Sequence, residues 1–314
     1  MEVTAEAYGR LRVHKPVRVC MSRAMNLAPL WTSPAPVAYR RAMDPEAGWN
    51  ATPRAPLRPG SDSGPLLFTR YAYAPNERGY CGPADHRELL EYGAAGVVDS
   101  GLVQLMQAFH GAWPYLELIA QATGIDPLDR RVIEAYWVGT PLLERVDLAR
   151  LGGSLQDRFR ARAGPSWNLM AESIPAGGLP HHSFHVFCVY PWVGLLRPED
   201  RGAQPLQILD QCRIRWGQVV TADGEQVVAR SRPLEWDGRE LLLGPPRAET
   251  VTRAVDGLGF VDDLRPGEWI SMHWGWVCDR LTPEQLRNLQ GYSGRILELT
   301  NRRLAHPGPA LILG

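Results

Sequence analysis

The sequence predicts an α+β protein, in which an α-rich region is followed by a small β-barrel and a closing helix. Apolar residues recur at helical spacing between residues 65 and 170. Beyond residue 205, short β-rich runs are separated by Asp-Gly turns, a pattern that is typical of small barrels. Thr282-Pro283-Glu284-Gln285 then combines an N-cap, a proline in the first turn and a glutamine at the third position, which predicts a helix start.

Residues 1–64 are predicted to be a disordered leader. The segment is rich in Pro, Arg, Ala and Gly and has no sustained hydrophobic period. Pro53–Gly60 cannot hold a helix, because each proline removes a backbone donor and restricts the residue before it. We expect order to begin near Gly64, and an over-extended start codon is an alternative origin for the leader.

Four helices are expected in the α-rich region, from their apolar spacing and their N-terminal prolines and caps. They begin at Pro83, span Leu102–Thr123 with a break at Pro114, run from an Asp126 N-cap to Val138, and span Glu144–Ala163 with a break at Gly152-Gly153.

The hydrophobic period then changes to two, which predicts strands. The expected strands are Phe184–Tyr190, Leu206–Leu209, Cys212–Val220, Glu225–Ser231, Glu240–Leu243 and Trp269–His273, with Asp-Gly hairpin turns at 222–224 and 236–238. The chain is therefore divided into a leader (1–64), an α-rich domain that ends in a β-rich bridge (65–205), a barrel domain (206–292) and a C-terminal tail (293–314).

Composition excludes several classes of partner. Lys+Arg and Asp+Glu are equal at 34 each, so there is no electrostatic case for nucleic acid or an anionic membrane. No apolar run approaches the roughly 18 residues of a spanning helix, and no secretory signal is evident. Five widely spaced cysteines in 314 residues favour reduced thiols and a cytoplasmic location.

The barrel segment resembles the HypC/HupF hydrogenase-maturation chaperones over about residues 206–292. Cys212–Val220 resembles the cysteine-led first strand of that family, and Gly267–Val277, with His273, resembles its histidine strand. Cys212 is internal and has no following proline, whereas the family's cysteine follows the initiator methionine. The resemblance implies an OB-type barrel in which Cys212 and His273 bind iron, carried transiently as a dicyano-carbonyl fragment. The implied partner is a [NiFe]-hydrogenase large subunit or a maturation protein.

The central block Leu66–Gly96 is similar to an uncharacterised actinobacterial family associated with hydrogenase gene clusters. This likeness agrees with the barrel resemblance. We therefore expect an accessory protein for hydrogenase assembly rather than an enzyme, with a metal-free interaction protein as one alternative.

A second alternative is a papain-like cysteine hydrolase centred on Cys81. Cys81-Gly82-Pro83 is predicted to start a helix, whose dipole would lower the pKa of the thiol. His185 precedes an apolar run and could act as the base, with Asp210 orienting it. The amide that normally builds the oxyanion hole before the cysteine is missing, and Asn76 is the nearest candidate.

The segment His181–Cys188 is the densest cluster of potential metal ligands in the sequence. On a strand, His181 and His185 would share one face while His182 points to the other. An alternative metal site therefore combines His181 and His185 with Cys81 or His86. No pair in the segment has zinc-finger spacing.

Overall fold

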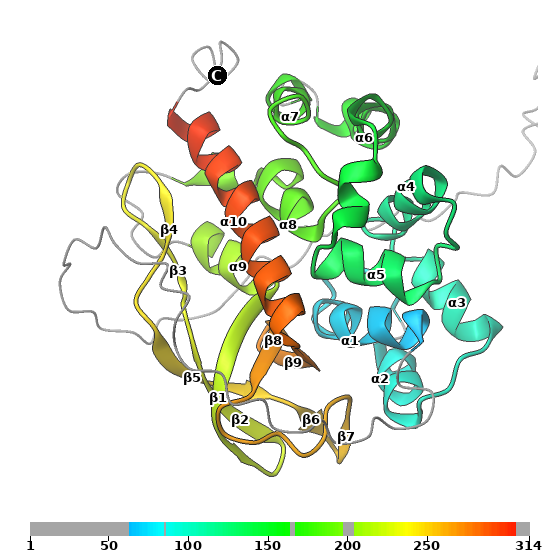
Figure 1. Ribbon diagram of the computed structural model, residues 1–314, viewed down its shortest axis with the longest axis vertical. Coiled ribbons are helices and arrows are strands. Elements are labelled where there is room, and N and C mark those ends of the chain that lie inside the picture. Colours follow the sequence, from blue (N-terminus) through cyan, green and yellow to red (C-terminus); the bar gives the residue numbers. More distant parts are fainter. Residues whose placement is uncertain (1–62, 85, 164–166, 197–203, 306–314) are drawn as a thin grey trace, which may run out of the picture. The chain divides into compact units, whose positions relative to one another are not determined.

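The computed structural model describes residues 63–84, 86–163, 167–196 and 204–305. The α+β class is confirmed (Figure 1). The expected leader lies outside the described residues except for Ser63 and Gly64, as do the last residues of the tail. Over the described ranges, no helix is both long and apolar enough to cross a bilayer.

Helices occupy most of the first half of the described chain. They are α1 (Gly64–Glu77), α2 (His86–Ala95), α3 (Ser100–Gln107), α4 (Trp113–Thr123), α5 (Arg130–Trp137), the 3-10 helix η1 (Pro141–Arg145), α6 (Leu148–Ala163), α7 (Trp167–Ser173), α8 (His182–Phe184), the π-helix η3 (His185–Val189), the 3-10 helix η4 (Pro191–Leu195) and α9 (Gln204–Cys212).

Helix α1 packs against both the helices and the sheet. The Ser63 side chain accepts a hydrogen bond from the Leu66 N–H, and Pro65 occupies the first turn, so the helix start is capped in the usual way. Every residue from Gly64 to Asn76 is buried. On the sheet side, Arg70 forms a buried ion pair with Asp279 at 2.8 Å. A helix without a solvent face is a core element, and α1 thus fixes the helices relative to the sheet.

Several predicted helix boundaries were wrong. Helix α2 begins at His86, so Pro83 lies in the preceding loop. The N-cap of α5 is Asp129, whose side chain accepts from the Arg131 N–H, whereas Asp126 accepts from Leu128 in the loop before it. Helix α6 runs without interruption through Gly152-Gly153, since two glycines weaken a helix but do not break it. The predicted break at Pro114 is confirmed, because this residue lies in the first turn of α4.

The two segments nearest the candidate ligands were predicted as strands, and both predictions were wrong. Phe184–Val189 belongs to α8 and the π-helix η3, and residues 184–188 are all buried. A fully buried apolar run has no solvent face, so its period cannot distinguish a strand from a helix. Residues 206–209 lie within α9, where Leu206, Leu209 and Cys212 are buried at three-residue, helical spacing.

The sheet is mixed, and its five strands pair in a closed ring in the order β1-β2-β5-β9-β8. The strands are β1 (Arg215–Asp223), β2 (Gln226–Ser231), β5 (Arg247–Thr252), β8 (Trp269–His273) and β9 (Trp276–Arg280). The ring closes through the antiparallel β1–β8 ladder and a single parallel pair between β5 and β9. A separate apolar cluster fills it, and includes Val219, Val227, Val251, Ile270 and Met272. Two short hairpins pair β3 (Leu234–Trp236) with β4 (Leu241–Leu243) and β6 (Ala254–Val255) with β7 (Leu258–Gly259).

The histidine strand and the closing helix were predicted correctly. Strand β8 has the predicted bounds, and β1 begins three residues after Cys212, which is the last residue of α9. In the capping box of α10 (Pro283–Ala305), Gln285 N–H donates to Thr282 Oγ1, and Thr282 N–H donates to Gln285 Oε1. Helix α10 continues well beyond residue 292, where the barrel segment was expected to end.

Candidate metal centre and its cavity

A small cavity lies where the first helices, the histidine segment and the sheet meet. Five side chains with metal-binding or nucleophilic atoms line it: Cys81, His182, His185, Cys212 and His273. Its volume of about 30 Å³ is enough to hold at least one water molecule. The two sites that the sequence suggested as alternatives, Cys212 with His273 and Cys81 with His185, therefore share one cavity.

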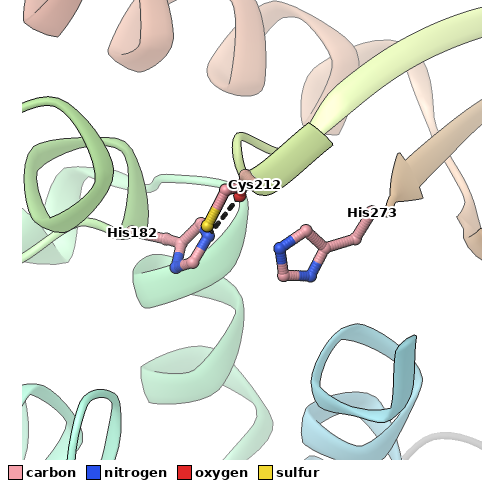
Figure 2. Close-up of side chains that lie close together, drawn as sticks. All are labelled: His182, Cys212 and His273. Atoms are coloured by element: carbon pink, nitrogen blue, oxygen red, sulfur yellow. Dashed lines mark hydrogen bonds between the residues drawn. The ribbon is translucent and has the colours of Figure 1, made fainter. Parts of the chain in front are cut away.

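Three of these side chains form a compact cluster. Ligand atoms of His182, Cys212 and His273 lie within 4.8 Å of one another, and all three residues are buried. Figure 2 shows them converging from separate segments: the first turn of α8, the end of α9 and the end of β8. A thiolate and two imidazoles are a ligand set for zinc, iron or copper, and not for calcium or magnesium.

The tautomer of His273 is fixed by a backbone carbonyl. His273 Nδ1 lies 2.7 Å from the Tyr71 carbonyl oxygen, which can only accept, so Nδ1 carries the proton. The lone pair is then on Nε2, which is buried and makes no hydrogen bond of normal geometry, although the Cys212 backbone is close to the ring. Metal-ligating histidines commonly donate their other N–H to a carbonyl in this way. His273 is therefore oriented as a metal ligand would be.

His182 is held by two hydrogen bonds. Its Nε2 donates to the Cys212 carbonyl oxygen at 2.8 Å, drawn as a dashed line in Figure 2, and its Nδ1 accepts from the Tyr136 hydroxyl at 3.3 Å. Either nitrogen must give up one hydrogen bond to bind a metal. His182 is thus less ready to act as a ligand than His273.

Burial sets the protonation states in the cluster. Burial raises the pKa of the Cys212 thiol well above its ordinary value, and the nearby Cys81 raises it further, whereas the Trp274 side chain opposes the rise. Burial also lowers the pKa of His273 to about 4 and lowers the pKa of His182. At neutral pH the cluster therefore holds a neutral thiol and neutral imidazoles. A bound cation would displace the thiol proton, since metals bind the thiolate.

Trp274 covers Cys212 from an unusual backbone position. It follows His273 in the β8–β9 turn, with φ of 54°, and Gly275 follows with φ of 74°. A bulky residue at positive φ is strained. The indole stacks on Tyr80 with ring centroids 4.2 Å apart, and its buried N–H makes no hydrogen bond of normal geometry but lies close to the Cys212 thiol. The strained turn thus places an N–H donor beside the thiol.

Cys81 lies in a structured loop between α1 and α2. The Asn76 side chain donates to the carbonyls of Cys81 and Pro83, at 2.7 and 2.6 Å. Cys81 is half-buried, and its Sγ lies 3.7 Å from the Tyr190 hydroxyl. Because Cys81 precedes α2 by five residues, it is not at a helix N-terminus. The dipole argument for a reactive thiol therefore fails.

His185 lies in the π-helix η3, a distortion that often marks functional sites. Its Nδ1 is 3.1 Å from the Tyr115 hydroxyl, and its buried Nε2 has no hydrogen-bond partner. Burial, together with the nearby Arg158 guanidinium, lowers the pKa of His185 to about 3. His182 and His185 are three residues apart along the helical segment, so both side chains can line the cavity.

The proposed orienting role of Asp210 in a hydrolase is not supported by its contacts. The Asp210 carboxylate binds the Arg213 guanidinium and the Leu234 N–H, and it makes no hydrogen bond to His185. A buried carboxylate beside two arginines pairs with them in preference to a neutral imidazole. The Cys81–His185–Asp210 arrangement is therefore not formed.

Two further candidates lie away from the cavity. His86 is exposed at the start of α2. His181 is the N-cap of α8: its Nδ1 accepts from the Ser183 N–H, and its ring stacks on Tyr292. Neither completes the alternative metal site with Cys81 and His185.

The sequence interpretation missed His182 as a partner of Cys212. Strand geometry would have pointed His182 away from His181 and His185, so it received no role. The available signal was Pro180 before a His-His-Ser sequence, since serine and histidine after a proline are compatible with a capped helix start.

Residues 60–307 match the model of a family described as a family of unknown function, DUF6390. The match covers most of the 314 residues, and the chain belongs to this family. No curated protein and no solved structure matches the chain.

Proposed function

We propose that this protein is an accessory protein for metallocentre assembly, which binds a transition-metal ion at Cys212 and His273 with His182 as the third ligand. The observation that carries the proposal is the convergence of three buried ligand atoms within 4.8 Å. The partnerless Nε2 of His273 supports it, because a buried unpaired nitrogen is costly unless something binds it.

The ligand set suits a cargo ion better than a permanent structural ion. Structural zinc sites have four protein ligands, whereas three leave a coordination position for a ligand from solution or from a client protein. The neutral thiol also favours reversibility, because reprotonation of a deeply buried thiolate assists release of the ion.

The proposed client is a [NiFe]-hydrogenase large subunit or one of its maturation proteins. This rests on the resemblance of Cys212–Val220 and Gly267–Val277 to the HypC/HupF chaperones, and on the closed sheet in which β1 and β8 are paired.

Anaerobic titration with Co²⁺, whose absorption reports thiolate coordination, tests the metal site. Loss of a residue that only hydrogen-bonds to a metal ligand weakens metal binding by roughly 10–100-fold. Cys212→Ser and His273→Gln each remove a ligand itself, so each should weaken Co²⁺ binding by more than that. Cys188→Ser is the matched control, because Cys188 is also buried but contacts Thr300 instead of the cavity. Wild-type affinity in both site variants, with folding confirmed by circular dichroism, would show that no metal binds there.

The client is tested in a strain that depends on its [NiFe]-hydrogenase. Cys212→Ser and His273→Gln should leave the large subunit without its iron centre, whereas Cys188→Ser should not. Normal iron content of the large subunit in both site variants would end the assembly role. Protein that binds the client but takes up no Co²⁺ would instead indicate a metal-free interaction protein.

A further inference from the structure

The same cavity carries a second pair of potential ligands that the proposed centre does not use. Cys81 and His185 line the same cavity as Cys212 and His273. The His185 side chain is 2% exposed, and its Nε2 has no hydrogen-bond partner. Cys81 is half-buried, whereas the four other ligand-type residues are buried. Of these five ligand-type residues, Cys81 is therefore the one that is partly exposed to solvent.

The loop that carries Cys81 is fixed from both sides. From α1, Asn76 holds the loop through the carbonyls of Cys81 and Pro83. From the sheet, the Arg78 guanidinium donates to the Trp274 carbonyl at 2.9 Å, and Tyr80 stacks on the Trp274 ring. Trp274 is the neighbour of His273 in the β8–β9 turn. The Cys81 loop is thus tied to the turn that positions the inner ligand.

We infer that Cys81 and His185 form an outer binding position, through which a soft or borderline transition-metal ion exchanges between solvent and the inner Cys212–His273 centre. The inference rests on the proposed metal centre. A thiolate and an imidazole attract the same class of ion as the inner cluster. Cys81 and His185 are not among the three residues whose ligand atoms lie within 4.8 Å of one another, so the outer position is distinct from the inner one. The two positions are adjacent because their residues line the same cavity.

The exchange conserves charge and needs no oxidant. The ion enters as Cys81 loses its thiol proton to water, and His185 Nε2 supplies a neutral lone pair. Transfer inward breaks the bonds to Cys81 and His185 and forms bonds to Cys212 and His273. The Cys212 proton leaves and Cys81 is reprotonated, so one proton is released per ion bound, and the oxidation state of the metal does not change.

Stopped-flow loading of the full chain with Co²⁺, and extraction of the bound ion with excess chelator, test this inference. Cys81→Ser should slow both loading and extraction by about tenfold, which corresponds to a barrier raised by roughly 1.4 kcal/mol. The equilibrium affinity should be unchanged, because the final ligands remain. His185→Gln should slow both steps in the same direction, and Cys188→Ser should match the wild type.

The outcomes separate this inference from the proposed centre. Unchanged loading and extraction rates in Cys81→Ser, with Co²⁺ binding still dependent on Cys212, would overturn the outer position alone. A loss of affinity in Cys81→Ser without slower loading would make Cys81 a permanent ligand, and would also overturn exchange. Co²⁺ binding that does not depend on Cys212 and His273 would remove the inner centre itself.

Discussion

Gly82 is predicted to be the residue that most restricts the Cys81 loop. Its φ is +83°, and a Cβ at this position would lie closer than 3.0 Å to the Phe109 ring. An L-residue at positive φ costs about 1–2 kcal/mol, and overpacking against a buried ring costs about 1–3 kcal/mol. Gly82→Ala should therefore lower the free energy of unfolding by about 2–5 kcal/mol.

Gly79 in the same loop provides a matched control. Its φ is +72°, but nothing lies within 4 Å of its Cβ position, so Gly79→Ala should cost only the backbone term of about 1–2 kcal/mol. Urea unfolding of both variants measures the difference, which isolates the Phe109 contact. Phe109→Leu in the Gly82→Ala background should recover part of the loss. Equal destabilisation by Gly79→Ala and Gly82→Ala would refute the claim that Phe109 positions the loop.

Three further predictions concern buried polar groups. Glu249→Gln should lower the free energy of unfolding by about 2–3 kcal/mol, because it removes the carboxylate that the buried Arg215 binds in bidentate fashion. Urea unfolding measures this loss, and a value below about 1 kcal/mol would contradict the prediction. The pKa of His185 is about 3 when folded, and its ordinary value applies when unfolded, so the unfolded chain binds more protons as pH falls below about 6.5. The free energy of unfolding of the metal-free wild type should therefore fall by about 2 kcal/mol per such histidine between pH 7.5 and 5. The fall should be smaller by that amount in His185→Phe, and an unchanged pH slope in this variant would contradict the prediction. Trp274→Phe should weaken Co²⁺ binding about tenfold, because it removes an N–H donor beside the Cys212 thiolate, and equal affinity would exclude that role.

The elements with local signals could be predicted from the sequence. The capping box at Thr282 and Gln285 predicts α10, because both of its hydrogen bonds form within four residues. Strand β8 also has a local partner, because it forms a hairpin with β9 in which His273 pairs with Trp276. Such contacts between near neighbours are displayed directly by a sequence.

The segments around the cavity could not be predicted in this way, because long-range packing determines them. The 182–189 segment is buried by α4, α5, α10 and α9, so no exposed face remains to give a helical period. The Cys212 carbonyl accepts from His182, thirty residues earlier in the chain, and the Tyr71 carbonyl binds a histidine 202 residues later. No local pattern encodes such pairs. Cys212 and His273 could be linked in advance only through the family resemblance.

The shared cavity changes the choice between carrier and hydrolase. From the sequence, Cys81 with His185 and Cys212 with His273 were alternatives in different regions, but all four residues line one space. A thiol hydrolase of this type needs an acid that orients its histidine, whereas Asp210 is bound to Arg213. A metal ion needs no such acid. Two thiols and three neutral imidazoles around one cavity therefore favour the binding and exchange of a metal ion over chemistry on a carbon substrate.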